Sequence, residues 1–518
     1  MISSPSSIKR QVIPRWRSLS RTIASRELSW PAGKYVSLKP RDMPRELVRR
    51  AKQWLREPSV LTAAELVESA IVHGREGEAV DASRFLARTG SAATPLLRKH
   101  AALVLERTGH EQDVPRDVII AQEDTAHVWR ARTRVNPHDP LAWVELALAQ
   151  VSRGHEEHAL RSMKVALQLA PEDRHVLRSA ARLYVHAQDP EKAHDLVRGN
   201  AATPYDPWLM AAEIALAPGA QRRPRYFKAG ISLLEKDSRL PRQITELAGA
   251  LATMFLIDGN RKRGKRLFRL SMTDPTGNSL AQAEWASESF GEIIVAEDQL
   301  QSSSDASEAM ARHLFRMGHF EESLSFVRKW IEEEPFSTLA YWAGALTANI
   351  LDDYDEAEKF ARAGLKYSPH SPPLLNNLVF SLACLDRLHD AEELLRTMPA
   401  DPADEVRAHI AEADRGLIAF RRGQVVEGEA HYRKAIAGFR RQQKWELERL
   451  AQAYFAREAV RAGVPHAHEL LAEAEKSSPG EGRPEVKRIL STARAILHAR
   501  RDLLPHGRTA QRAASRDL

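Results

Sequence analysis

NPHDPLAWVELALAQVSRGHEEHALRSMKVALQLAP, residues 136–171, is the stretch that decides the fold of this chain. Its apolar residues recur at the spacing that places them on one face of an α-helix, and they form two such stripes. A turn at Gly154 separates the stripes, and Pro171 ends the second stripe because proline cannot continue a helix. The stretch therefore predicts two antiparallel helices joined by a short turn.

Small residues are placed where the two helices would cross. Ala147 and Ala159 let the helices approach closely, and a bulky side chain at either position would force them apart. Leu146 and Met163 are predicted to fill the seam between neighbouring helix pairs. The spacing of small and large residues thus specifies the packing of the pair.

The same pattern recurs with a period of 34 residues, and a fixed period of this length is typical of repeat architectures. In successive copies the small position is held by Ala159 and Ala193, then by Ser323, Ala357, Ala391 and Gly428. The last interval is 37 residues, which predicts a three-residue insertion near residues 399–404. Residues 206–303 keep the helix-pair pattern, but their closing positions drift.

Residues 136–171 resemble the tetratricopeptide repeat (TPR). The positions that carry the resemblance are Trp143, Leu146, Ala147, Gly154, Ala159, Met163, Ala166 and Pro171. The resemblance implies an all-α fold, a right-handed superhelical TPR-type α-solenoid in which the first helices of successive pairs line a concave groove. It also implies that the chain holds other macromolecules.

We expect five segments along the chain. They are a basic, largely extended N-terminal arm at 1–55, degenerate helix pairs at 56–125, TPR-like repeats at 126–300 (clear at 136–205), TPR repeats at 301–480, and a capping helix (484–503) with a basic tail at 481–518. The Ser-rich run at 296–306 predicts a loop or hinge between the two repeat regions.

Charge is distributed unevenly along the chain. Of the net charge of +7, residues 1–55 carry +10 and residues 486–518 carry +6, which leaves −9 for the remainder. The single cysteine, Cys384, excludes an intramolecular disulfide and fits a reducing compartment. No secretory signal and no apolar run long enough to span a membrane occur, so we expect a cytoplasmic protein without membrane insertion.

Catalytic and cofactor motifs are not supported by the sequence. GNRKRGKR, residues 259–266, has the glycine spacing of a phosphate loop, but Arg266 replaces the Ser or Thr that would bind Mg²⁺. His155 and His158 do not have the spacing of zinc hydrolases and are expected to face water. We therefore predict no enzyme, no cofactor and no metal site.

A dense cluster of positive charge begins shortly after Gly259 and overlaps this motif. Its members are Arg261, Lys262, Arg263, Lys265, Arg266 and Arg269. Either they form a solvated face beside acidic neighbours, or they bind phosphates. The second interpretation makes nucleic acid the alternative partner of this chain.

First-helix positions carried over from the TPR resemblance predict a partner-binding groove. It is formed by Arg312, Phe315, Arg316, Trp342, Phe380, Phe420 and Arg421, with Glu308, Leu346, Asn376 and Leu417 beside them. Aromatic residues and arginine are enriched where binding energy concentrates, and an acidic amphipathic segment of a partner protein would suit this lining. The competing interpretation is that the aromatic residues only pack between adjacent helix pairs. Val144 and Leu148 occupy positions where chaperone-tail-binding TPR domains carry Lys and Asn, so that ligand is not expected.

The N-terminal arm contains VIPRWR, residues 12–17. Pro14 favours an extended conformation at Ile13, and an exposed Trp16 between Arg15 and Arg17 would lose a large apolar contribution. This segment is therefore expected to dock, either on the chain itself as a cap or on an external partner. The function predicted from the sequence is a non-catalytic protein-interaction scaffold, and the alternative is a nucleic-acid-associated factor that uses the arm and the 261–269 cluster.

Overall fold

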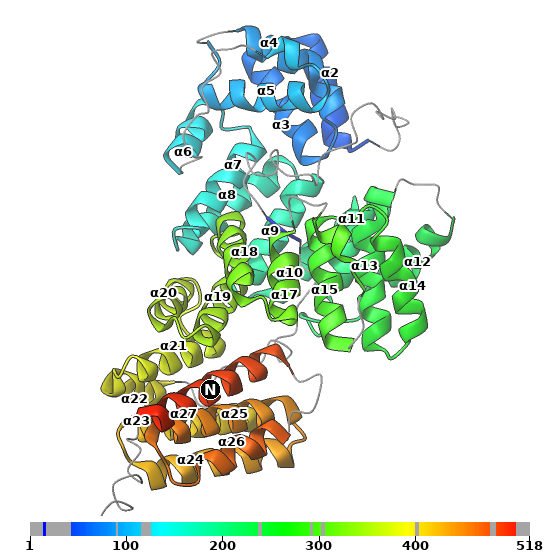
Figure 1. Ribbon diagram of the computed structural model, residues 1–518. Coiled ribbons are helices and arrows are strands. Elements are labelled where there is room, and N and C mark those ends of the chain that lie inside the picture. The colour runs from blue at the N-terminus through cyan, green and yellow to red at the C-terminus, as the bar shows by residue number, and fades with distance from the viewer. Residues whose placement is uncertain are drawn as a thin grey trace, which may run out of the picture. The chain divides into compact units, whose positions relative to one another are not determined.

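The computed structural model describes residues 14–16, 43–89, 92–114, 126–236, 241–290, 294–301, 306–398, 404–476 and 483–503 (Figure 1). Throughout these ranges the regular structure is helical, and no strand occurs in them. The all-α class predicted from the sequence is confirmed. The predicted register also holds, as the turns and helix crossings described below show.

Two compact units make up the chain. We call residues 9–310 together with 329–336 the N-terminal unit, and residues 1–8, 311–328 and 337–518 the C-terminal unit. The sequence predicted a boundary between repeat regions at residue 300, whereas the division falls inside helix α17 (Ser307–Met317). Helix α18 (Phe320–Glu333) also contributes to both units.

The N-terminal unit is built from consecutive helices that run back and forth. They are α2 (Arg45–Arg56), α3 (Val60–Val72), α4 (Val80–Arg88), α5 (Pro95–Arg107), α6 (Ala126–Val135), α7 (Pro140–Val151), α8 (Glu156–Leu169), α9 (Arg174–His186), α10 (Pro190–Arg198), α11 (Pro207–Leu216), α12 (Phe227–Lys236), α13 (Pro241–Ile257), α14 (Arg261–Ser271), α15 (Gly277–Phe290) and α16 (Glu297–Gln301), with short 3₁₀ turns at Glu76–Ala79, Glu111–Asp113 and Thr203–Tyr205.

The C-terminal unit continues the same alternation. Its helices are α19 (Thr338–Ile350), α20 (Tyr354–Leu365), α21 (Pro372–Cys384), α22 (Leu388–Thr397), α23 (Glu405–Arg421), α24 (Val425–Arg441), α25 (Trp445–Ala462), α26 (Ala467–Lys476) and α27 (Pro484–Leu503).

Each unit stacks helix pairs in the manner of an α-solenoid. The first helix of a pair packs on its own second helix, as α7 does on α8 and α19 on α20. It also packs on the first helix of the next pair, and this gives the series α7, α9, α11, α13, α15 in one unit and α19, α21, α23, α25 in the other. Each pair therefore buries its apolar face on its neighbours, which is the packing rule of repeat proteins.

The turn inside each pair keeps the 34-residue period even where glycine is missing. A left-handed residue occurs at Gly154 (φ 78°) and again at Gln188 (φ 60°). In the C-terminal unit it occurs at Gly318 (φ 86°), Asp352 (φ 61°) and Asp386 (φ 58°). Because this conformation is strained for residues with a Cβ atom, its recurrence at the same spacing shows that the turn geometry is imposed by the packing of the helices.

The small positions lie at the predicted helix crossings. Ala159, Ala193, Ala357 and Ala391 are fully buried. At Gly428 a Cβ atom would lie 2.6 Å from Cδ2 of Phe420, closer than a carbon contact allows. Close approach of the paired helices is therefore the reason for these residue types.

Two boundaries differ from the expectation. The predicted extended arm, residues 1–55, contains most of helix α2, because Leu47 and Arg50 are buried against the rest of the unit and hold the segment in a helix. Within the loop predicted at 296–306, residues 297–301 form α16, whose Leu300 is buried in an apolar cluster with Leu280 and Ala309. The helix expected at 484–503 is α27, and it packs on α25 and α26.

Candidate functional site

Most of the predicted groove residues belong to the core of the C-terminal unit. Trp342, Phe380 and Phe420 are 4%, 1% and 5% exposed. The ring of Phe380 meets the ring of Tyr454 edge-on with 5.0 Å between centroids, so helix α25 covers it. Their burial disfavours the expectation that these rings anchor a partner and favours the competing interpretation, packing between helix pairs.

Arg421 belongs to a buried ionic group in the same C-terminal unit. Its Nε donates to Oε2 of Glu458 over 2.8 Å, and Arg457 donates to the other carboxylate oxygen over 3.0 Å. Burial alone would raise the pKa of Glu458, but the two guanidinium groups outweigh it and the pKa is lowered. Arg421 therefore neutralises a core carboxylate and is unavailable to a partner.

Three further predicted groove residues, all on α17, are also partly accessible. Arg312, Phe315 and Arg316 are half-buried. Phe315 packs edge-on against Phe320 at 5.2 Å, and Arg316 donates to Nδ1 of His313 over 3.1 Å. Both contacts are local to the α17–α18 pair.

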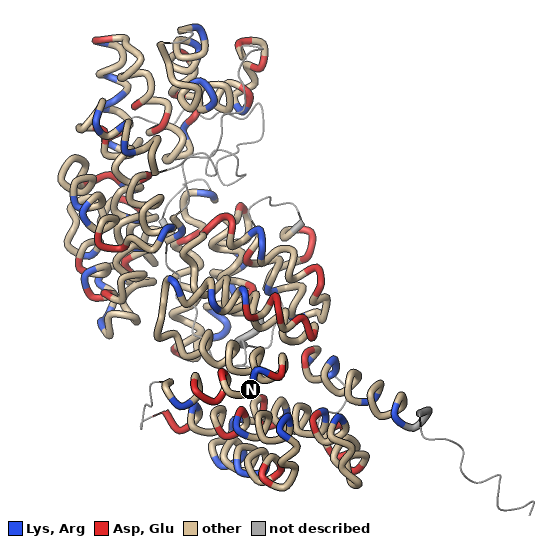
Figure 2. The backbone as a smooth tube through the Cα atoms, turned by 90° about the vertical axis from the view of Figure 1, so that its left-hand side faces the viewer, with Lys and Arg blue, Asp and Glu red and all other residues tan. Residues whose placement is uncertain are grey.

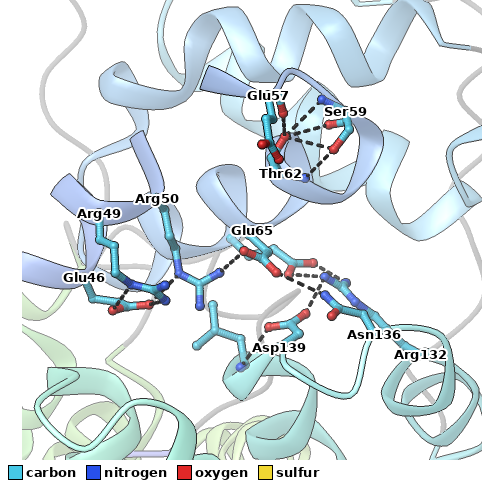
Figure 3. Close-up of polar contacts among 12 residues, drawn as sticks. Glu46, Arg49, Arg50, Glu57, Ser59, Thr62, Glu65, Arg132, Asn136 and Asp139 are labelled. Atoms are coloured by element: carbon cyan, nitrogen blue, oxygen red, sulfur yellow. Dashed lines mark hydrogen bonds and ion pairs between the residues drawn. The ribbon is translucent and has the colours of Figure 1, made fainter. Parts of the chain in front are cut away.

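A buried ionic network joins α2, α3, α6 and the start of α7 in the N-terminal unit (Figure 3). Arg50 of α2 pairs with Glu65 of α3 at 3.1 Å, and Asn136 donates to the same carboxylate over 3.1 Å. Arg132 pairs at 2.9 Å with Asp139, the N-cap of α7. Because its members come from α2, α3, α6 and the turn before α7, the network holds these segments together.

Glu68 is the deepest member of this network. Both oxygens accept from the guanidinium of Arg132, and Oε1 lies 3.2 Å from Nδ1 of His100. Burial would raise the pKa of Glu68, but Arg132 and His100 together lower it to about 2. This carboxylate is therefore ionised under all ordinary conditions.

The N-terminal unit carries a second set of charged and aromatic residues on α9, α11 and α13, which we call the first-helix row: Arg174, Arg178, Trp208 and Glu246. Arg174 Nε donates to Asp206 over 2.6 Å, and Arg178 donates to Glu246 over 2.7 Å. The two guanidinium carbons lie 5.9 and 5.1 Å from the ring centroid of Trp208. Trp208 is half-buried, so part of the stack remains accessible.

The row was not among the residues predicted from the sequence, although the sequence contains a signal for it. Asp139, Asp173 and Asp206 precede three successive first helices, and each caps its helix through its side chain. An N-cap aspartate recurring at nearly the repeat period would have marked where each first helix begins. The residues one and five positions after Asp173 are the two arginines of the row.

The described part of the arm, Pro14–Trp16, lies within the N-terminal unit in a non-helical conformation. Trp16 is fully buried, and its ring meets Phe336 edge-on at 5.7 Å. Arg15 donates to Glu308 over 3.0 Å and lies 3.7 Å from Glu333. Ile13 and Arg17, which were predicted to belong to the same docking element, lie outside the described residues.

Phe336 is held from its other side by helix α9. The guanidinium of Arg182 lies 4.8 Å from the ring centroid, and His186 meets the ring edge-on at 5.4 Å. Burial, together with the charge of Arg182, lowers the pKa of His186 to about 4, so this imidazole is neutral near pH 7. We call Arg182, His186, Glu308, Glu333 and Phe336 the arm site.

The predicted phosphate-binding residues lie on helix α14. Arg261, Lys262, Arg263, Arg266 and Arg269 are exposed and Lys265 is half-buried. Arg263 pairs with Glu235 at 3.5 Å and stacks 4.5 Å from the ring centroid of Phe255. Basic and acidic residues occur together over much of the described backbone in Figure 2, whereas all the charged residues of α14 are basic, as are those of α6 and α9.

The two glycines of the phosphate-loop-like motif have structural roles. Gly259 adopts φ 78° in the turn between α13 and α14. A Cβ atom at Gly264 would lie 2.7 Å from the side chain of Leu256. The motif follows a helix, whereas a phosphate loop follows a strand, and this context does not fit nucleotide binding.

Metal and membrane features were also sought in the described residues. They contain no group of three or more His, Cys, Asp or Glu side chains placed to hold a metal ion. His155, which precedes α8, and His158 on α8 are exposed, with 5.9 Å between their ring centroids. Among the described helices, none combines the length and the apolar character needed to cross a bilayer.

Comparison with known proteins adds a remote likeness in structure. No family model and no curated protein matches the chain. Among solved structures, the crystal structure of yeast Tom70 matches 88% of this chain and 99% of its own, with 12% sequence identity and a TM-score of 0.29. At this level of similarity the comparison carries no argument, and the description of the chain rests on its own stacked helix pairs.

Proposed function

We propose that this chain is a non-catalytic scaffold that binds a partner protein on the first-helix row of the N-terminal unit. The observation that carries the proposal is the stack of Arg174 and Arg178 around the half-buried Trp208. Tryptophan and arginine are the residue types that contribute most to binding energy at protein interfaces. Here they come from the first helices of consecutive pairs, α9 and α11. In TPR-like proteins the first helices line the surface that binds a partner.

The chemistry of the row favours an acidic and aromatic partner segment. Each guanidinium has five N–H donors. Arg174 uses one donor on Asp206, and Arg178 uses two, on Glu246 and on the backbone carbonyl of Trp208, so carboxylates of a partner can accept from the remaining N–H groups. An aromatic side chain of the partner would extend the stack on Trp208. Because the single cysteine fits a reducing compartment, we place this interaction in the cytoplasm.

Replacing the ring at the centre of the row tests the proposal. Immobilised full-length protein should retain partners from nuclease-treated lysate, and Trp208→Ala should lose them while keeping its helical circular dichroism spectrum. Tyr205→Ala is the matched control, because Tyr205 lies in the adjoining turn and is 74% exposed. Retention of the same proteins by Trp208→Ala and by the control would refute the assignment.

The alternative function, binding of nucleic acid, is favoured by helix α14. Positive charge fills its first turn, where the helix dipole prefers negative charge, so a bound phosphate would relieve an unfavourable arrangement. Lys262, Arg266 and Arg269 are exposed, and no partner for them occurs in the described residues. Exposed lysine and arginine of this kind bind phosphates with strong salt dependence.

Salt dependence separates the two functions. Binding of a fluorescent single-stranded oligonucleotide should weaken steeply between about 50 and 200 mM salt if α14 contacts phosphates. Changing Lys262, Arg266 and Arg269 to Gln would remove three contacts and reduce the slope of log K against log salt by about 2. An unchanged slope would exclude α14 as the contact surface.

A further inference from the structure

We propose that Pro14–Trp16 is a tethered ligand: it fills a recognition site for segments that contain an arginine followed by an aromatic residue, and it keeps that site closed until such a segment of a partner displaces it. This inference goes beyond the scaffold function, because it concerns the arm site, whose residues are distinct from the first-helix row. It also assigns a regulatory role to the N-terminal arm.

The arm site has two subsites with different chemistry. The first is acidic: Glu308 and Glu333 face the guanidinium of Arg15 at 3.0 and 3.7 Å, and Ser307 donates to Glu333 over 2.5 Å and so orients it. Glu308 is 3% exposed, and a carboxylate so deeply buried is costly without a cation beside it. The subsite therefore selects a positively charged side chain.

The second subsite is aromatic. Phe336 is fully buried and is held by Arg182 and His186, both on α9. These contacts do not involve the arm, so the ring is positioned before any ligand arrives. An edge-to-face partner such as Trp16 gains both apolar burial and the favourable ring geometry.

The arm resembles a bound peptide more than a repeat element. The contacts described come from three residues outside any helix, whereas the helices of both units bury their faces on neighbouring helices. The walls of the site come from α9, from the start of α17, from the end of α18 and from Phe336, which lies shortly after α18. The tripeptide itself is not part of a helix.

One contact in the site is incomplete. The indole Nε1 of Trp16 is buried and has no acceptor in the described residues. Leaving a buried donor unsatisfied is unfavourable, because the donor loses its hydrogen bond to water without replacing it. The arm is therefore a submaximal occupant, and a segment with phenylalanine at this position would avoid the cost and can compete with it.

Peptide binding to the full-length chain tests the proposal. The probe is a fluorescein-labelled peptide of residues 10–19, RQVIPRWRSL, measured by anisotropy. The host proteins are the wild type and an arm variant, Arg15→Glu with Trp16→Ala, which empties the site. Because a tethered segment competes at an effective concentration in the millimolar range, the arm variant should bind the peptide about a hundredfold more tightly than the wild type.

Two matched controls locate the binding. Adding Glu308→Gln to the arm variant should weaken binding about thirtyfold, because it removes one partner of a buried charge pair. A peptide with Trp16→Ala should not bind measurably, and a peptide with Trp16→Phe should bind at least as tightly as the parent. These readouts do not depend on the first-helix row, so they can fail or succeed separately from the scaffold function.

The outcomes that overturn the proposal are distinct. Equal binding to the wild type and the arm variant would mean that the arm does not compete. Binding that is insensitive to Glu308→Gln would place the peptide elsewhere. Loss of helical circular dichroism in the arm variant would show that Pro14–Trp16 is an integral part of the core and not a displaceable ligand.

Discussion

Replacing Glu68 by Gln should destabilise the N-terminal unit through the loss of one buried charge. The amide has nearly the shape of the carboxylate, so the cavity stays filled. It cannot neutralise the guanidinium of Arg132, which then keeps Asp139 at 2.9 Å as its anionic partner. The change therefore isolates the electrostatic part of this network.

The magnitude follows from the protonation equilibrium. The pKa of Glu68 is lowered from 4.5 to about 2, and each pKa unit corresponds to about 1.36 kcal/mol, so ionised Glu68 contributes about 3 kcal/mol to the free energy of unfolding. Removal of one partner from a buried ion pair typically costs about 3–5 kcal/mol, which agrees with this figure. In a domain of this size, 1 kcal/mol changes the melting temperature by about 2 °C, so Glu68→Gln should lower it by about 6 °C.

The effect also has a defined pH dependence. Because the pKa is lower in the folded state, the contribution is fully present above the unfolded-state pKa of 4.5 and is lost as the pH falls towards 2. Thermal melts followed by circular dichroism at pH 7 and pH 4 should therefore show the difference between wild type and variant shrinking by about 0.8 kcal/mol at the lower pH.

The control is Glu157→Gln on the exposed face of α8, which should melt like the wild type. The electrostatic reasoning would be refuted by a Glu68→Gln variant with unchanged melting at pH 7. It would also be refuted by a melting difference that stays the same between pH 7 and pH 4.

Further expectations concern packing and reactivity. Ala357→Leu should lower the free energy of unfolding by about 1–3 kcal/mol, because Ala357 is fully buried where α19 and α20 cross; unchanged melting would mean that the assigned register is wrong. Gly428→Ala should cost a similar amount in a urea titration, since its Cβ would lie 2.6 Å from the ring of Phe420, and a neutral effect would contradict this contact. Burial raises the pKa of the Cys384 thiol, so a thiol reagent should label the native chain far more slowly than the chain in denaturant; equal rates would argue against a buried thiol.

The repeat itself could be predicted from sequence because its determinants are local. Hydrophobic periodicity, the turn at Gly154 and the small residues at Ala159 and Ala357 act within a single helix pair, and the structure has them at the predicted places. The same local rules missed the turns at Gln188 and Asp352, where a left-handed residue is not glycine. At these two turns the packing of the helices determines the backbone conformation, and the residue type indicates that conformation only weakly.

The candidate binding surfaces were decided by tertiary structure, because the exposure of a helix face depends on which other segment covers it. Phe380 lies on a first helix at a position that the repeat pattern would leave open, yet Tyr454 and Arg457 from α25 bury it. The pairs that define the arm site join residues far apart in the chain, such as Arg15 with Glu308, and no periodicity relates them. The sequence by itself determined that this chain forms helix pairs of fixed register, since that depends on neighbours within one repeat. Only the packing of distant segments decided which aromatic and charged side chains became core and which remained available to a ligand.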